Sequence, residues 1–76
     1  MLFLVWYDDN MKTPVVDKIQ AAIAAYVERF KLRPSLVLVN VIDHMELADV
    51  LVRHERTVQP NTFWVGREES TDLTLA

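Results

Sequence analysis

The chain has 76 residues, a net charge of −3 and no cysteine. This length allows one domain, which buries only about 60% of its unfolded surface and is marginally stable alone. The composition excludes disulfide bonds and thiolate zinc sites, and the acidic balance argues against a general polyanion-binding protein. No apolar run approaches the roughly 20 residues that span a bilayer. We therefore expect a soluble, cytoplasmic protein with no membrane contact.

Residues 2–7 form an uninterrupted apolar run, which predicts a strand that is buried on both faces. Thr13 and Pro14 suit the N-cap and first position of a helix, because the hydroxyl accepts a hydrogen bond and proline lacks an N–H. A helix over residues 14–31 is expected to follow, with Lys18 and the other charged side chains facing water. Its predicted core stripe consists of Val16, Ile19, Ile23, Tyr26, Val27 and Phe30.

A second strand is predicted over residues 35–41, again with apolar side chains on both faces. Strand, helix and strand in one sheet connect by a right-handed crossover, so we expect the two strands to form a parallel pair. Asp43 and Glu46 then have the spacing of a capping box. This spacing predicts one helical turn over residues 44–48.

Residues 47–58 fit the pattern of a helix and also that of a strand. The β-branched residues and the following Gln59-Pro60-Asn61 turn favour a strand, which we place over residues 49–57. Residues 62–65 predict the last strand. Because only a short turn separates the two, we expect them to pair as a hairpin.

The predicted order of elements is strand, helix, strand, short helical turn, strand and strand. This order corresponds to an α/β (α+β) two-layer sandwich, with one long helix on a four-stranded mixed sheet. We expect residues 1–66 to form this single domain and residues 67–76 to form a flexible tail. The segment Val5-Trp6-Tyr7-Asp8 resembles, in outline, the start of ferredoxin-like domains such as the small CRISPR-associated nucleases, which place an Asp after an apolar first strand. This resemblance concerns the fold alone and implies no function.

Acidic side chains follow both strands that the helix connects. Asp8 and Asp9 follow the first strand and Asp43 follows the second, and parallel strands end at the same edge of a sheet. These carboxylates are the ligands that Mg²⁺ or Mn²⁺ prefers, with an oxygen from Asn40 and a water oriented by His44. The pattern predicts, as one alternative, a phosphodiesterase or nuclease-like hydrolase. Turn and capping roles explain the three acidic residues without a metal and are the favoured interpretation.

A second alternative is weak binding of single-stranded nucleic acid by Arg53, Arg56 and Trp64, since bases stack on aromatic side chains and phosphates pair with cations. Phe63 and Trp64 are neighbours in a strand and must point to opposite faces, so only one of them can serve such a platform. Glu55 dilutes the positive charge. The net negative charge makes nucleic acid the less favoured partner.

The apolar strands exceed what one helix can cover, because a helix covers one face of a small sheet. An exposed apolar face marks an interface, and a two-fold dimer would bury the same face of both copies. The uncovered set on the first strand is either Leu2, Leu4 and Trp6, or Phe3, Val5 and Tyr7. We expect the former set, with Val37 and Val39, to form the interface. A second helix over residues 44–58 would instead cover this face within the monomer. The favoured function is a homodimeric or partner-binding interaction module without catalytic activity and without a cofactor.

Overall fold

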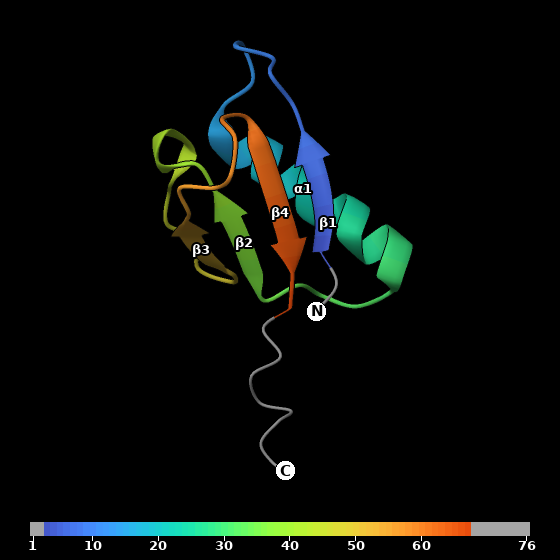
Figure 1. The fold of residues 1–76 in the computed structure, drawn as a ribbon. Coiled ribbons are helices and arrows are strands. Elements are labelled where there is room, and N and C mark those ends of the chain that lie inside the picture. The colour runs from blue at the N-terminus through green and yellow to red at the C-terminus, as the bar shows by residue number, and fades with distance from the viewer. Residues whose placement is uncertain (1–2, 68–76) are drawn as a thin grey trace.

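The computed structural model describes residues 3–67, and these form a sheet of four strands with one long helix on it. Its elements are β1 (Phe3–Tyr7), α1 (Val15–Phe30), β2 (Leu36–Val39), the 3-10 turn η1 (Val41–Asp43), β3 (Leu51–His54) and β4 (Thr62–Gly66). Figure 1 shows α1 lying across one face of the sheet. The predicted α+β sandwich with a four-stranded mixed sheet is therefore confirmed.

The strand order β1-β4-β2-β3 corrects both predicted strand pairings. β1 and β2 run in the same direction, but β4 lies between them and pairs antiparallel to each, so they are not a parallel pair. β3 pairs in parallel with β2, and the predicted hairpin between β3 and β4 does not form. A ferredoxin-like domain carries two helices, whereas residues 3–67 contain a single α-helix.

Burial explains why β4 takes a central place and β3 an edge. Phe63 and Val65 on β4 are 0% exposed, which requires neighbours on both sides of the strand. Arg53 and His54 on β3 are exposed, and polar side chains are typical of edge strands because they keep an edge soluble. The short turn favours a hairpin locally, but the gain from burying β4 between two strands decides the pairing.

The helical turn after β2 begins earlier than predicted, and residues 44–48 contain no helix. Asn40 caps η1, because its side-chain oxygen accepts a hydrogen bond from the N–H of Ile42 at 3.1 Å. The other end of the same amide donates to the carbonyl oxygen of Val58 at 2.9 Å. The side chain of Asn40 thus bonds to η1 and to the backbone at Val58. Asn40 is the N-cap, and Asp43 does not have that role.

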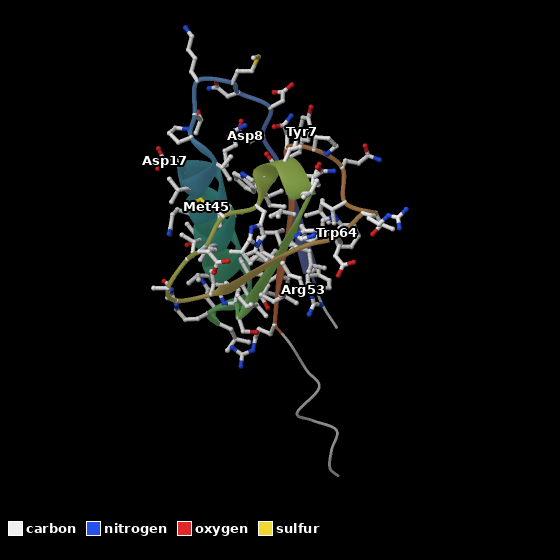
Figure 2. The ribbon with its side chains drawn as sticks, turned by 90° about the vertical axis from the view of Figure 1, so that its left-hand side faces the viewer. Tyr7, Asp8, Asp17, Met45, Arg53 and Trp64 are labelled. Carbon is white, nitrogen blue, oxygen red and sulfur yellow. The ribbon has the colours of Figure 1, made fainter. Side chains whose placement is uncertain are left out.

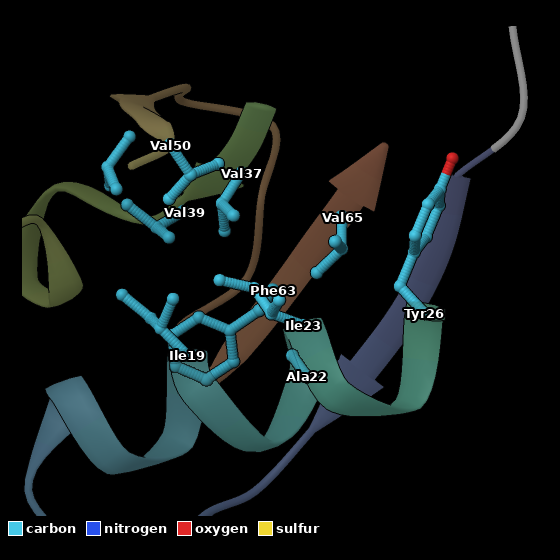
Figure 3. Close-up of a cluster of buried hydrophobic side chains, with 10 residues drawn as sticks. Ile19, Ala22, Ile23, Tyr26, Val37, Val39, Val50, Phe63 and Val65 are labelled. Atoms are coloured by element: carbon cyan, nitrogen blue, oxygen red, sulfur yellow. The ribbon is translucent and has the colours of Figure 1, made fainter. Parts of the chain in front are cut away.

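The hydrophobic core lies between α1 and the sheet (Figure 3). α1 begins at Val15 with Pro14 in the capping position and no side-chain cap, so Thr13 does not have its predicted role. Lys18, which we expected to face water, is only 4% exposed. No helix within residues 3–67 is long and apolar enough to cross a membrane. The buried core consists of Ile19, Ala22, Ile23, Tyr26, Val37, Val39, Val50, Val52, Phe63 and Val65.

Replacing Ile19 by alanine should lower the free energy of unfolding by about 2–5 kcal/mol, because this side chain is fully buried under the sheet and its loss leaves a cavity. The matched control is Ile42→Ala, at a position that is 69% exposed, where the change should stay within about 0.5 kcal/mol. Urea unfolding followed by tryptophan fluorescence measures both. Equal losses for the two variants would contradict the assignment of the core.

Candidate functional site

The acidic residues predicted from sequence do lie where β1 and β2 end, but each has a local structural partner. Asp8 accepts a hydrogen bond from the backbone N–H of Asn10 at 2.9 Å, which is a turn role. Asp43 is 5% exposed, and its Oδ2 accepts from the backbone N–H of Asn61 at 2.8 Å. The carboxylates of Asp8 and Asp43 therefore serve the loop backbone.

The structure does not assemble the predicted metal site. Within residues 3–67, no three side chains of His, Cys, Asp or Glu come together as a group that could hold an ion. The ring of His44 packs against that of His54, with 5.5 Å between ring centroids, and its Nε2 lies 3.2 Å from the carbonyl oxygen of Val52. His44 thus contacts β3.

Asn61 connects the loops that sequence reasoning placed at this edge of the sheet, although the sequence marks it only as a turn residue. Its N–H bonds to Asp43, its carbonyl oxygen accepts from the N–H of Asp8 at 2.9 Å, and its Oδ1 lies 3.4 Å from Nζ of Lys18. Its φ of 63° lies in the left-handed region, which Asn tolerates better than most residues. We call these four residues the Asn61 node; they hold together the ends of β1, η1, β4 and the start of α1.

Removing the carboxylate in Asp43→Ala should lower the free energy of unfolding by about 1–3 kcal/mol, because the N–H of Asn61 loses its partner in a partly buried site. Asp49→Ala is the matched control: its carboxylate pairs with Arg33 at 3.2 Å on the exposed surface, where such pairs contribute about 0–1 kcal/mol. Urea unfolding at constant salt compares the two variants. A larger loss for the Asp49 variant would contradict a structural role for Asp43.

Asp9 pairs with a tyrosine. The hydroxyl of Tyr7 donates to Oδ2 of Asp9 at 3.2 Å. This hydrogen bond raises the pKa of Tyr7 above its ordinary value, and the negative charge of Asp9 and slight desolvation act in the same direction. Tyr7 is 64% exposed, so the shift is a property of the surface and carries little folding stability.

Asp9→Asn should lower the pKa of Tyr7 toward its ordinary value, since the variant loses both the charge and the strongest acceptor. Ultraviolet absorbance of tyrosinate measures this titration, and the same measurement in a Tyr7→Phe variant identifies the signal of Tyr7. Asp17→Asn, on the solvent-facing side of α1, should leave the titration unchanged. An unchanged midpoint in the Asp9 variant would contradict the contact.

The sheet face opposite α1 carries large side chains that are open to solvent; we call it the open face. Tyr7, Trp64 and Arg53 project from the side of the sheet away from α1 in Figure 2. The exposed fractions are 64% for Tyr7, 52% for Val5 and 37% for Trp64. By alternation along the strands, the open face consists of Phe3, Val5, Tyr7, Leu36, Leu38, Leu51, Arg53, Thr62, Trp64 and Gly66. Leu36 and Thr62 are buried, so the exposed part of this face is centred on Val5, Tyr7 and Trp64.

The central row of the open face crosses all four strands. Val5 lies opposite Trp64, Trp64 opposite Leu38, and Leu38 opposite Arg53. The ring of Phe3 meets that of Trp64 edge to face, with 5.8 Å between centroids. The row therefore forms one continuous surface, in which an aromatic ring at the centre is flanked by aliphatic side chains.

The interface residues expected from sequence lie on the covered face. Val37 and Val39 are 0% exposed in the core, and Leu4 and Trp6 are half-buried against it; Leu2 lies outside the described residues, as do residues 68–76 of the expected tail. The open face carries the other set that the sequence allowed. Both sets are apolar and alternate with a period of two, so only the docking of α1 distinguishes them.

Of the residues considered for nucleic-acid binding, Arg53 and Trp64 lie on the same face of the sheet, and Arg56 lies apart from them. Trp64 is exposed and Phe63 is buried, which confirms that the two point to opposite faces. Arg53 lies on the open face, but its Nε is 3.5 Å from Oε2 of Glu55, so its charge already has a partner. Arg56 is exposed beyond the end of β3. The open face thus has an aromatic centre without a basic surround.

Comparison with known proteins supplies no function for this chain: no protein family, curated protein or solved structure matches it. The argument for a function rests on geometry. Residues 3–67 enclose no pocket and gather no cluster of metal ligands.

Proposed function

We propose that the protein is a self-associating interaction module that buries its open face against the same face of a second copy. The observation that supports this proposal is the row of Val5, Trp64 and Leu38, which ends in Arg53 on β3 and lies on the sheet face opposite α1. Large apolar side chains on a sheet normally pack against a second layer. A second copy supplies that layer without any additional chain.

The open face has the extent of a small functional patch on a protein surface. Four strands about 4.8 Å apart, each with about five residues rising roughly 3.3 Å, present about 300 Å² in projection. Apolar patches of roughly 300–600 Å² are the largest on typical monomers and are often functional. A domain of 76 residues has a small core of its own, so the added burial would raise its stability.

Charge favours a second copy over nucleic acid as the occupant. Arg53 is the one charged side chain that we place on the open face, and Glu55 lies beside it at 3.5 Å. Burying the face therefore does not leave an unpaired cation. An unpaired buried cation would destabilise the complex by several kcal/mol, about as much as removing one partner of a buried ion pair. A nucleic acid would need a basic surface, and the chain has a net charge of −3.

The same features favour binding over catalysis. Neither the Asn61 node nor the His44–His54 contact leaves a cluster of acidic or metal-ligating groups facing a cavity. The chain has no cysteine, which suits the reducing cytoplasm, where we propose that it acts.

Trp64→Glu should halve the solution mass, because it places a carboxylate at the centre of the open face of both copies. Light scattering on a sizing column at micromolar concentration measures the mass against the 8.8 kDa of one chain. The control is Ile42→Glu, at a position 69% exposed on η1, which should keep the wild-type mass. A folded Trp64→Glu protein with the wild-type mass would overturn the proposal.

A further inference from the structure

We infer that the outer edge of β1 pairs with β1 of a second copy, so that the two sheets join into one sheet of eight strands. This inference concerns the backbone at the edge of the sheet and does not rest on the proposed role of the open face. Its evidence is the direction of the β1 peptide groups, the contrast between the two sheet edges, and the position of α1.

The peptide groups of β1 that face outward belong to the residues of the open face. The N–H of Asp8 bonds to the carbonyl oxygen of Asn61, in register with the pairing of β1 and β4. Bonding residues alternate along an antiparallel ladder, so Leu4 and Trp6 also turn their peptide groups toward β4. The peptide groups that point away from the sheet are those of Phe3, Val5 and Tyr7.

A hydrogen bond between β4 and the residue before β2 supports this assignment. The carbonyl oxygen of Gly66 accepts from the N–H of Ser35 at 2.9 Å, so the peptide groups of Gly66 face β2. Gly66 lies opposite Phe3 in the register of β1 and β4. This pair is therefore a non-bonded pair of the ladder, as the outward direction of the Phe3 peptide groups requires.

The two edges of the sheet differ in how they are protected. β1 contains no charged residue and no proline, and a long apolar edge of this kind is a template for another strand. β3 is shorter and carries Arg53, and the outward carbonyl oxygen of Val52 already meets Nε2 of His44 at 3.2 Å. Only the β1 edge is prepared for strand addition.

A second copy fits this edge because β1 is complementary to itself. A two-fold axis at Val5 would pair it with the partner's Val5, and Phe3 with the partner's Tyr7, and would match all three outward peptide groups in an antiparallel ladder. The same register sets Leu4 opposite the partner's Trp6 on the helix side. Apolar and aromatic cross-strand pairs stabilise sheets, and no like charges meet at the axis.

α1 offers support beneath an added strand. In Figure 1 the C-terminal part of α1 extends past β1, beyond the edge of the sheet. The apolar side chains of Val27 and Phe30 in this part are only half-buried. With this two-fold axis, the α1 helices of the two copies would be antiparallel. The first turn of α1 contains the acidic Asp17 and the last turn the basic Arg29, so the adjacent ends of the two helices would carry residues of opposite charge.

The test uses the full chain, made by chemical synthesis with N-methylvaline at position 5. The methyl group removes the outward N–H of Val5 and blocks the edge, but keeps the valine side chain on the open face. N-methylation of Val52 is the matched control, because the N–H of Leu51 bonds to Ser35 and that of Glu55 to Val39, so the N–H of Val52 points away from β2 at the other edge. Circular dichroism checks that each variant is folded.

The wild-type chain should have four times the mass of one 8.8 kDa chain when both surfaces are used. N-methylation of Val5 should halve this mass, N-methylation of Val52 should not change it, and Trp64→Glu should leave a dimer joined at β1. A folded Trp64→Glu monomer would overturn the edge inference, as would an unchanged mass after N-methylation of Val5. A mass that falls with N-methylation of Val5 but not with Trp64→Glu supports the edge and overturns the open-face proposal.

Hydrogen exchange provides a second measurement that needs no variant. In the assembled wild-type protein the amide of Val5 should exchange slowly, and its protection should fall on dilution, because its bond is made to another chain. The amide of Val52 should exchange fast at every concentration. Fast exchange of Val5 at concentrations where the protein is assembled would overturn the inference, and would also exclude an added strand from any other chain in that sample.

Discussion

The packing of one amphipathic helix against a sheet that is apolar on both faces is the constraint on which the rest of this structure depends. α1 buries Ile19, Ile23 and Tyr26 against one face, and the described chain has no second helix for the other. The helix therefore determines which of two equally apolar sets of side chains becomes core. α1 also extends past β1 at the edge of the sheet (Figure 1).

The insertion of β4 between β1 and β2 depends on this core and is held at one end by the Asn61 node. Phe63 and Val65 gain complete burial from the central position. Asn61 then bonds to the loops after β1 and in η1, and reaches the buried Lys18 on α1. Two of the residues considered for a metal site, Asp8 and Asp43, thus belong to a structural node, Asp8 through its backbone N–H and Asp43 through its carboxylate. The polar groups at this end of the sheet therefore stabilise the fold.

Sequence reasoning was most successful for the elements and least successful for their pairing. The apolar periods of β1, α1 and β2 predicted these elements within a few residues, because side-chain period is a local property. The hairpin of β3 and β4 was wrong, because pairing depends on which strand gains most from burial. The turn after β2 was displaced, since Asn40 could bond to Val58, a residue eighteen positions away. For the candidate site, the places of Asp8 after β1 and of Asp43 after β2 could be read from the sequence, whereas their link through Asn61 could not.

The sequence by itself determined the long helix and the four strands that residues 3–67 contain, and a surplus of apolar strand surface over what one helix covers, because these follow from composition and period alone. The tertiary structure alone decided that Val37 and Val39 lie in the core and that Val5, Tyr7 and Trp64 face outward. A strand with apolar residues at every position has two equivalent faces. Their equivalence ends only when the helix docks on one of them, and that choice depends on contacts between residues far apart in the chain.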